Sequence, residues 1–149
     1  MNVKRILVPT DFSAQSARAL DYATELAEPF EGEVVLLHVC EARPALITEP
    51  PFSPPAESEE AVREDAQKHL EQVLSSRLQH RVHFHPVVRS GDVLLRIEEV
   101  AREMNADMIC MGTHGKTGMT RALLGSVAER VVRTSHFPVL TLSPDAKAA

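Results

Sequence analysis

Short apolar runs alternate with helix-like segments along the whole of this sequence. The runs at 3–8, 34–39 and 107–111 are almost continuously apolar, which is typical of strands covered on both faces. Between them, apolar residues recur at helical spacing, most clearly over 93–104. Such alternation predicts a parallel sheet joined by right-handed crossovers, with helices on both faces. We therefore predict an α/β fold of three layers.

Five strands and four helices are predicted in alternation. The strands are 3–8, 34–39, 81–88, 107–111 and 138–142, and the helices run from Ser13 to about Ala27, from Ser58 to about Leu78, over 93–104 and over 125–134. The third strand alternates polar and apolar residues and contains Pro86, which favours an edge position. His83 and His85 share one of its faces, but no third ligand at suitable spacing is near, so we expect no metal site.

A chain of 149 residues is most simply one domain, here 1–149. Five of its ten prolines fall within 41–58. Because proline fixes φ and disfavours helix in the preceding residue, this stretch is predicted to be a loop. We favour a variable, partly ordered insertion over a lid. The tail at 144–149 is expected to fray.

Bulk composition narrows the classes of protein to which the chain can belong. The net charge of −5, one Tyr and no Trp argue against a nucleic-acid-binding protein, which is usually basic and uses stacking aromatics. No stretch approaches the roughly 20 apolar residues of a membrane span, and the N-terminal apolar run is too short for a signal peptide. Cys40 and Cys110 are expected to be buried thiols in a reducing compartment. The predicted location is the cytoplasm.

The stretch 112–126 holds four of the six glycines and joins the fourth predicted strand to the last helix. Glycine has no Cβ and therefore lets a ligand approach the backbone closely. The first amides of a helix lack partners within the helix and carry the positive end of its dipole. Lys116, Arg121 and His114 can add positive charge. We interpret this stretch as a binding site for the phosphates of a nucleotide.

A second polar turn, Pro9-Thr10-Asp11, follows the first predicted strand. In parallel α/β sheets, ligands bind beyond the carboxyl ends of the strands, at the point where the strand order reverses. If the first and fourth strands are neighbours, the crevice between the two turns is the predicted site.

Three known motifs do not account for the glycine spacing. Gly115-Lys116-Thr117 matches the end of a P-loop, but the first glycine of that motif would fall at residue 110, which is Cys. The dinucleotide fingerprint fails on spacing, and the G-x-S-x-G nucleophile elbow of hydrolases is absent from the sequence. The pattern that remains is Gly112-x2-Gly115-x9-Gly125-Ser126.

This pattern, together with Asp11, resembles the ATP-binding branch of the universal stress protein family. The resemblance covers nearly the whole chain, from 6–13 (ILVPTDFS) through 34–39 and 107–112 to 124–131 (LGSVAERV) and 136–140 (HFPVL). It implies a parallel sheet of five strands in the order 3-2-1-4-5, which makes the first and fourth strands neighbours.

The resemblance also assigns residues to ATP. It implies an adenosine pocket lined by Pro9, Thr10 and Asp11, an adenine edge read by the backbone of Val39, a ribose beside Gly112, and phosphates bound by His114, Gly115, Gly125, Ser126 and Val127. Thr113 and Arg121 complete the predicted nucleotide-binding set, and Mg²⁺ would bridge phosphate oxygens. A structural alternative stays open, in which Gly112 and Gly125 serve only loop geometry while Ser126 and Asp11 only cap helices.

The sequence offers no obvious base to activate water beside the phosphates, so we predict no catalytic residues. The preferred function is an ATP-binding regulator in the stress response, with slow or no ATP hydrolysis. The alternatives are an enzyme that hydrolyses ATP or transfers a phosphoryl group, and a partner-binding module with a vestigial loop. Exchange of Gly115 and Gly125 for valine is expected to block nucleotide binding and leave the fold intact.

The last predicted strand offers a partner surface. Val139, Leu140 and Leu142 make it apolar, and an edge strand exposes backbone groups that proteins normally cover. We predict a homodimer in which the strand from Pro138 to Leu142 pairs antiparallel with its copy across a two-fold axis, as the resemblance also implies.

Overall fold

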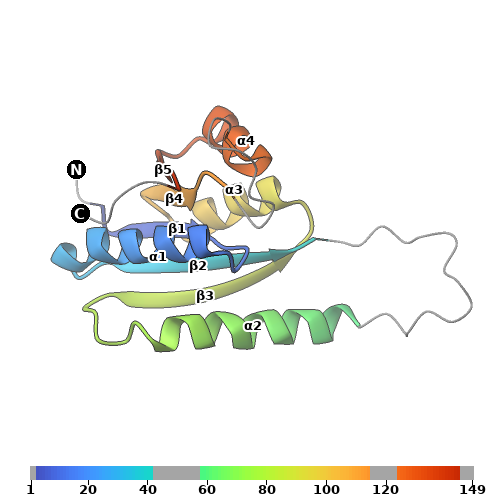
Figure 1. Ribbon diagram of the computed structural model, residues 1–149, viewed down its shortest axis with the longest axis horizontal. Coiled ribbons are helices and arrows are strands. Elements are labelled where there is room, and N and C mark those ends of the chain that lie inside the picture. The colour runs from blue at the N-terminus through green and yellow to red at the C-terminus, as the bar shows by residue number, and fades with distance from the viewer. Residues whose placement is uncertain (1–2, 42–57, 115–123, 145–149) are drawn as a thin grey trace, which may run out of the picture.

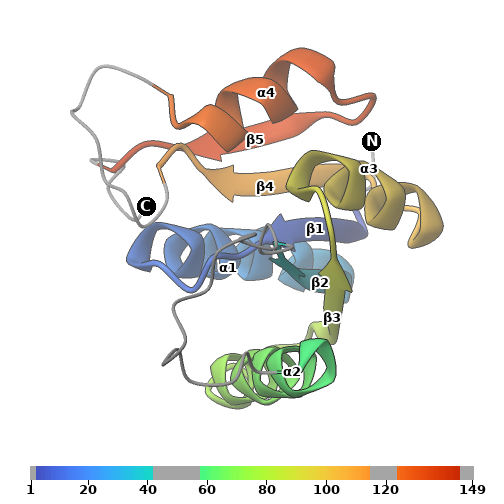
Figure 2. The ribbon, with the colours of Figure 1, turned by 90° about the vertical axis from the view of Figure 1, so that its right-hand side faces the viewer.

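The computed structural model describes residues 3–41, 58–114 and 124–144. These residues contain an all-parallel sheet in the order β3-β2-β1-β4-β5 with connecting helices (Figure 1). In chain order the elements are β1 (Arg5–Pro9), α1 (Ala14–Ala27), the 3-10 helix η1 (Glu28–Phe30), β2 (Glu33–Cys40), α2 (Glu59–Ser75), β3 (His83–Ser90), α3 (Val93–Glu103), β4 (Met108–Gly112), α4 (Ser126–Thr134) and β5 (Val139–Leu142). Figure 2 shows the strands in succession from β5 to β3. The predicted fold class and strand order are confirmed.

The predicted elements all occur, but several of their ends differ. β3 extends to Ser90, because its register with β2 continues unbroken from Glu33↔His83 to Cys40↔Ser90. α2 ends at Ser75 rather than near Leu78, since residues 76–79 form turns. The predictions made for 42–57, 115–123 and 145–149 lie outside the described residues.

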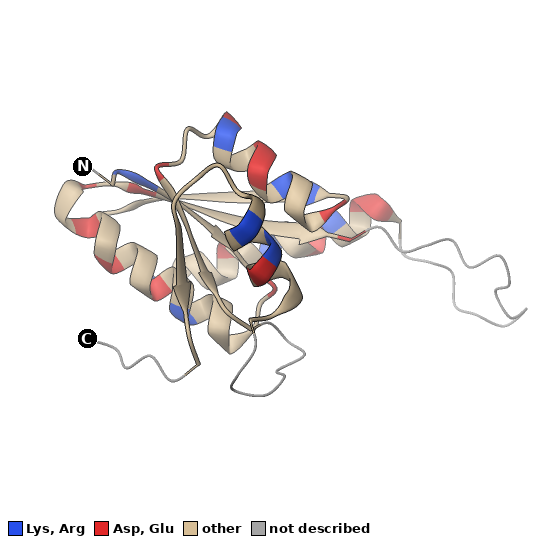
Figure 3. Cartoon of the chain, turned by 90° about the horizontal axis from the view of Figure 1, so that it is seen from above, with Lys and Arg blue, Asp and Glu red and all other residues tan. Residues whose placement is uncertain are grey.

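Apolar side chains form one core on each face of the sheet. The core against α1 and α2 includes Ile6 and Leu36, and the core against α3 and α4 includes Leu7 and Ile109. Burial on both faces explains why the strands are continuously apolar. Charged residues of both signs lie mainly on the helices (Figure 3). Within the described residues, no helix is long and apolar enough to cross a membrane.

Polar side chains begin three of the helices. Ser13, Ser58 and Asp92 each accept an N–H from the first turn of α1, α2 and α3 respectively, as their positions in the sequence predict. Asn105, with a φ of 50°, follows the end of α3 in the left-handed conformation. The start of α4 has no such capping side chain and forms part of the candidate site.

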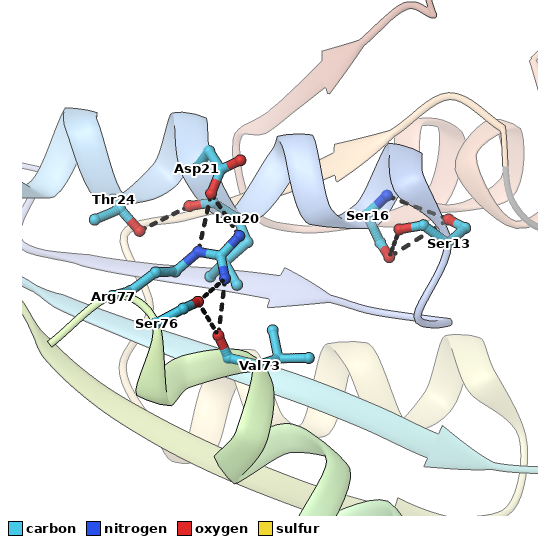
Figure 4. A network of polar contacts seen from close by, with 8 residues as sticks. All are labelled: Ser13, Ser16, Leu20, Asp21, Thr24, Val73, Ser76 and Arg77. Atoms are coloured by element: carbon cyan, nitrogen blue, oxygen red, sulfur yellow. Dashed lines mark hydrogen bonds and ion pairs between the residues drawn. The ribbon is translucent and has the colours of Figure 1, made fainter.

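Arg77 ties the C-terminal end of α2 to α1 (Figure 4). Its guanidinium donates to Asp21 Oδ1 through Nη2 at 2.6 Å and Nε at 2.9 Å, and to the Val73 carbonyl at 2.8 Å. The Arg77 side chain is only 16% exposed. The two helices on this face of the sheet are therefore fixed to each other at this end.

β3 lies at one edge of the sheet, as Pro86 predicts. The His83 N–H donates to the Gly32 carbonyl, and the Gly91 N–H donates to the Cys40 carbonyl. Since backbone direction alternates along a strand, the odd-numbered residues of β3 face β2. Pro86 therefore faces outward, where its missing N–H breaks no bond to β2.

Candidate functional site

The two turns predicted to form the site lie at the same edge of the sheet. β1 and β4 are neighbours, with Ile6 opposite Met108 and Leu7 opposite Ile109. Both strands run in the same direction, so their carboxyl ends meet. The strand order reverses here, and parallel α/β proteins bind ligands at such a position. We call the residues 9–13, 112–114 and 125–127 around these strand ends the switch point.

Hydrogen bonds fix the shape of the turn after β1. The Thr10 N–H donates to the Leu37 carbonyl at 2.8 Å, and Thr10 Oγ1 accepts the Phe12 N–H at 3.0 Å. Asp11 Oδ1 accepts the Ser13 N–H at 3.0 Å, while Ser13 Oγ caps α1. Through this bond, Asp11 supports the residue that caps α1.

Phe12 occupies this turn in an unfavourable backbone conformation. Its φ of 62° lies in the left-handed region, which costs a residue with a side chain about 1–2 kcal/mol. The ring packs against His38 of β2 at a centroid distance of 4.5 Å and stacks on His69 of α2 at 3.9 Å, with an interplanar angle of 7°. His38 Nδ1 in turn donates to the Thr10 carbonyl at 2.8 Å. Side chains from two other elements therefore hold the strained residue in place.

Backbone hydrogen bonds join the end of β4 to the start of α4. The Thr113 N–H donates to the Leu142 carbonyl of β5 at 2.9 Å, and the Thr113 carbonyl accepts the Gly125 N–H at 2.6 Å. Thr113 is 7% exposed, and its hydroxyl lies 2.9 Å from His114 Nδ1. Residues 112–114 and 125–127 therefore lie side by side, although 115–123 separate them in the sequence.

Gly112 and Gly125 both have protein atoms where a side chain would begin. A Cβ on Gly112 would stand 3.0 Å from Gln15 Cβ, and a Cβ on Gly125 would stand 2.8 Å from the Thr113 carbonyl oxygen. Packing within the protein therefore accounts for glycine at both positions. This agrees with the alternative in which Gly112 and Gly125 serve loop geometry. Gly125→Val would therefore disturb this turn as well as any bound ligand, because the new side chain would collide with the Thr113 backbone.

Two buried polar atoms near the switch point, Gln15 Oε1 and His114 Nε2, have no hydrogen-bond partner within the described part of the chain. Leaving a buried polar group unpaired costs about 1–3 kcal/mol. Because His114 Nε2 is enclosed and Nδ1 lies against Thr113, neither ring nitrogen is open to a ligand.

α4 begins without a capping side chain. Gly125 occupies the N-cap position, so no N-cap side chain bonds the first amides of the helix. Ser126 and Val127 stand exposed at this end, which carries the partial positive charge of the helix dipole. Amides at the N-terminus of a helix bind phosphate and other anions in many proteins.

The structure gathers most of the predicted nucleotide-binding residues at the switch point. These are Pro9, Thr10, Asp11, Gly112, Thr113, His114, Gly125, Ser126 and Val127. Val39 lies near the carboxyl end of β2, the strand next to β1, whereas Gly115 and Arg121 fall outside the described residues. Phe12, Gln15 and His69 were not predicted. No local signal links Phe12 to His69, since their contact joins a turn to a helix far along the chain.

Other hollows of the molecule lie away from the switch point. One of about 620 Å³ opens between α2 and the outer part of β3, and another of about 510 Å³ lies beside η1 and Arg81. Across 3–41, 58–114 and 124–144, no three His, Cys, Asp or Glu side chains are grouped to hold a metal ion. The described switch point contains backbone amides, hydroxyls, the Asp11 carboxylate and the His114 imidazole.

The chain is similar to known proteins along nearly all of its length. A sequence model of the universal stress protein family matches residues 2–143. Universal stress protein MJ0531 of Methanocaldococcus jannaschii is 36% identical over 97% of this chain and 84% of that protein. The solved structure of MJ0577 from the same organism has a TM-score of 0.79 at 26% identity, covering 99% of this chain and 100% of that chain. An Arabidopsis thaliana universal stress family protein solved with AMP bound shares the fold, with a TM-score of 0.63 at 18% identity over 96% of this chain and 93% of that chain.

Proposed function

Because the chain belongs to the universal stress protein family, we propose that it binds ATP at the switch point and acts in the cytoplasm as a regulator in the stress response, with slow or no ATP hydrolysis. The adenosine lies against Pro9, Thr10, Asp11 and the backbone of Val39, and the ribose lies beside Gly112. The triphosphate lies along 113–114 and 125–127. Gly115 and Arg121 join this set on the evidence of sequence alone.

The uncapped start of α4 is the observation that carries the proposal. α1, α2 and α3 each begin with a serine or aspartate side chain that accepts an amide N–H, whereas α4 begins with Gly125. The hydrogen bond from Gly125 to Thr113 holds the amides of Ser126 and Val127 beside the end of β4. A triphosphate supplies acceptor oxygens for helix N-terminal amides, in the place that a capping side chain takes in α1, α2 and α3. Mg²⁺, bound mainly by those oxygens, would neutralise part of the phosphate charge.

The fold supports an adenine nucleotide as the ligand. The Arabidopsis protein with bound AMP has the same fold, so the fold accommodates such a molecule. The glycine spacing favours ATP among adenine nucleotides, through its resemblance to the ATP-binding branch of the family. Regulation is favoured over catalysis because the two candidate bases of the switch point are engaged within the protein: Asp11 Oδ1 accepts the Ser13 N–H, and His114 Nδ1 lies 2.9 Å from the Thr113 hydroxyl.

Calorimetry with MgATP and with MgGTP tests the binding. We expect saturable binding of ATP that is weakened by Ser126→Ala, which removes a hydroxyl at the proposed phosphate position. Ser58→Ala is the matched control, because it makes the same exchange at the start of α2 and should leave ATP affinity unchanged. Absence of heat at millimolar ATP would favour a partner-binding module instead.

Steady-state release of phosphate tests whether the protein hydrolyses ATP slowly or not at all. We expect release slower than about 1 s⁻¹, the low end of ordinary enzyme turnover. Phosphate release faster than this would indicate an ATP-hydrolysing enzyme, provided that Ser126→Ala loses both ATP binding and the release.

We further propose a homodimer formed through β5. The carbonyls of Pro138 and Leu142 accept N–H groups from Ile109 and Thr113, so even-numbered residues of β5 face β4. Val139 and Thr141 therefore direct their backbone groups away from the sheet. Unlike β3, β5 has no proline at an outward position, and an antiparallel copy would satisfy these groups.

A further inference from the structure

We propose that Phe12 is a positioning residue for the adenosine half of the site and that His69 of α2 holds it in place. This inference rests on the proposed ATP site. Phe12 comes directly after Thr10 and Asp11, the proposed adenosine contacts. We call Phe12, His38 and His69 the aromatic clamp.

Within the clamp, side chains from two elements contact the Phe12 ring. His38 of β2 packs against it at 4.5 Å, and His69 of α2 stacks nearly parallel to it at 3.9 Å. His38 is itself fixed through its hydrogen bond to the Thr10 carbonyl. α2 also contacts α1, because Arg77, just after the C-terminal end of α2, is bonded to Asp21 of α1 (Figure 4). The ring therefore contacts side chains from two elements, and one of them, His38, is itself hydrogen-bonded to the turn.

The clamp matters because Phe12 is held in the left-handed region at a φ of 62°. A bulky residue adopts this conformation only when its surroundings enforce it. The Phe12 N–H donates to Thr10 Oγ1, so a change in this residue moves the threonine hydroxyl and the adjoining carboxylate. Without the clamp, the turn would populate other conformations, and apparent ATP affinity would fall with the fraction of binding-competent molecules.

The effect should be confined to the adenosine half of the site. The proposed phosphate groups at 113–114 and 125–127 are held by bonds from Thr113 to Leu142 and Gly125. Neither bond involves β2, α2 or the turn after β1. Loss of the clamp should therefore weaken ATP while sparing inorganic tripolyphosphate, a difference that general damage to the fold would not produce.

Four variants of the full chain test the proposal. Phe12→Leu keeps apolar bulk but removes the stack, and His69→Ala removes one side of the clamp at an exposed helix position. His69→Phe restores an aromatic face and should recover affinity. Lys68→Ala, the exposed neighbour on α2, is the matched control. Calorimetry with MgATP should show Kd raised about 2–10-fold in Phe12→Leu and His69→Ala, the range for one aromatic pair, with Kd for tripolyphosphate unchanged.

The possible results separate this inference from the function on which it rests. Wild-type protein that does not bind ATP overturns the proposed function and the clamp's role together. Wild-type binding with unchanged Kd in both clamp variants overturns the clamp alone. Equal weakening of ATP and tripolyphosphate, or a low thermal midpoint in His69→Ala that His69→Phe does not restore, would reduce the clamp to a structural contact.

Discussion

Packing within the protein leaves little space for a side chain at Gly125, with or without a ligand. Since a Cβ there would stand 2.8 Å from the Thr113 carbonyl oxygen, we expect Gly125→Ala to lower the free energy of unfolding by about 1–3 kcal/mol, the usual range for overpacking. Urea denaturation measures this change. Ser126→Ala, at the exposed next position, is the control and should stay within about 0.5 kcal/mol of wild type. Unchanged stability of Gly125→Ala would contradict the geometry of this turn.

The two thiols should differ in reactivity. Burial raises the pKa of the Cys110 thiol to about 12, and its Sγ donates to the Ala19 carbonyl at 3.5 Å. Burial also raises the pKa of the half-buried Cys40, with the charge of Arg63 opposing it. Because the thiolate is the reactive form, we expect a thiol-reactive dye at pH 8 to label Cys110 only after unfolding in urea. Rapid labelling of native Cys40→Ser protein would show that Cys110 is accessible.

At the residue scale, the sequence predicts the roles of some residues but not of others. The residues that flank a strand end, such as Asp11 and Gly112, stand out by type and position. The packing reason for Gly125 depends on a carbonyl twelve positions earlier, and the clamp on Phe12 depends on a helix that follows the second strand. Such contacts have no local pattern, so only the folded chain reveals them.

Glu33 links β1, β2 and β3 at the amino ends of these strands. Its carboxylate lies 2.7 Å from Arg5 Nη2 and 3.1 Å from His85 Nε2. Burial alone would raise the pKa of Glu33, but the hydrogen bond and charge of Arg5, followed by the charge and hydrogen bond of His85, hold it below 4.5. The backbone N–H of Arg81, followed by the side chain of His80, lowers the pKa of Glu28. Burial opposes the lowering of the pKa of Glu98, which comes from the side chain and backbone of His136.

A lowered pKa gives a definite pH dependence. The unfolded chain binds the Glu33 proton more readily than the folded chain, so the carboxylate stabilises the fold above its unfolded pKa, and this contribution is lost as the pH falls through the folded value. We expect Glu33→Gln to be less stable than wild type at about pH 6, with the difference shrinking toward about pH 3. Urea midpoints across this range measure it, and a constant difference would rule out the linkage.

At the element scale, starts were easier to predict than ends. Ser13, Ser58 and Asp92 mark helix starts because a capping side chain is a local chemical requirement. α2 ends at Ser75, where residues 76–79 form turns, and the extension of β3 to Ser90 follows from its pairing with β2. That pairing is a property of the sheet and leaves little trace in the local sequence.

The proposed dimer can be tested at a single outward residue. Thr141→Pro would remove an N–H that faces away from β4, so the bonds between β4 and β5 should survive while the pairing of two copies is lost. We expect wild-type dimer and Thr141→Pro monomer in sedimentation velocity. Thr141→Val keeps the amide and should remain dimeric. A monomeric wild type at high protein concentration would overturn this interface.

At the scale of the whole molecule, alternating strands and helices predict the layers and the parallel sheet. They do not predict the strand order, because no local pattern states which strands are neighbours. The order 3-2-1-4-5 came from the family resemblance and is confirmed. It is this order that brings Pro9 and Gly112 to one edge and turns two separate motifs into a single candidate site.

Titration of isotope-labelled protein with MgATP, followed through backbone amide chemical shifts, tests most directly whether the switch point binds the nucleotide. We predict the largest shifts at 10–13, 39, 112–114 and 125–127, with little change in the hollow between α2 and β3. Shifts centred on that hollow, or no shifts at millimolar ATP, would contradict the proposed site.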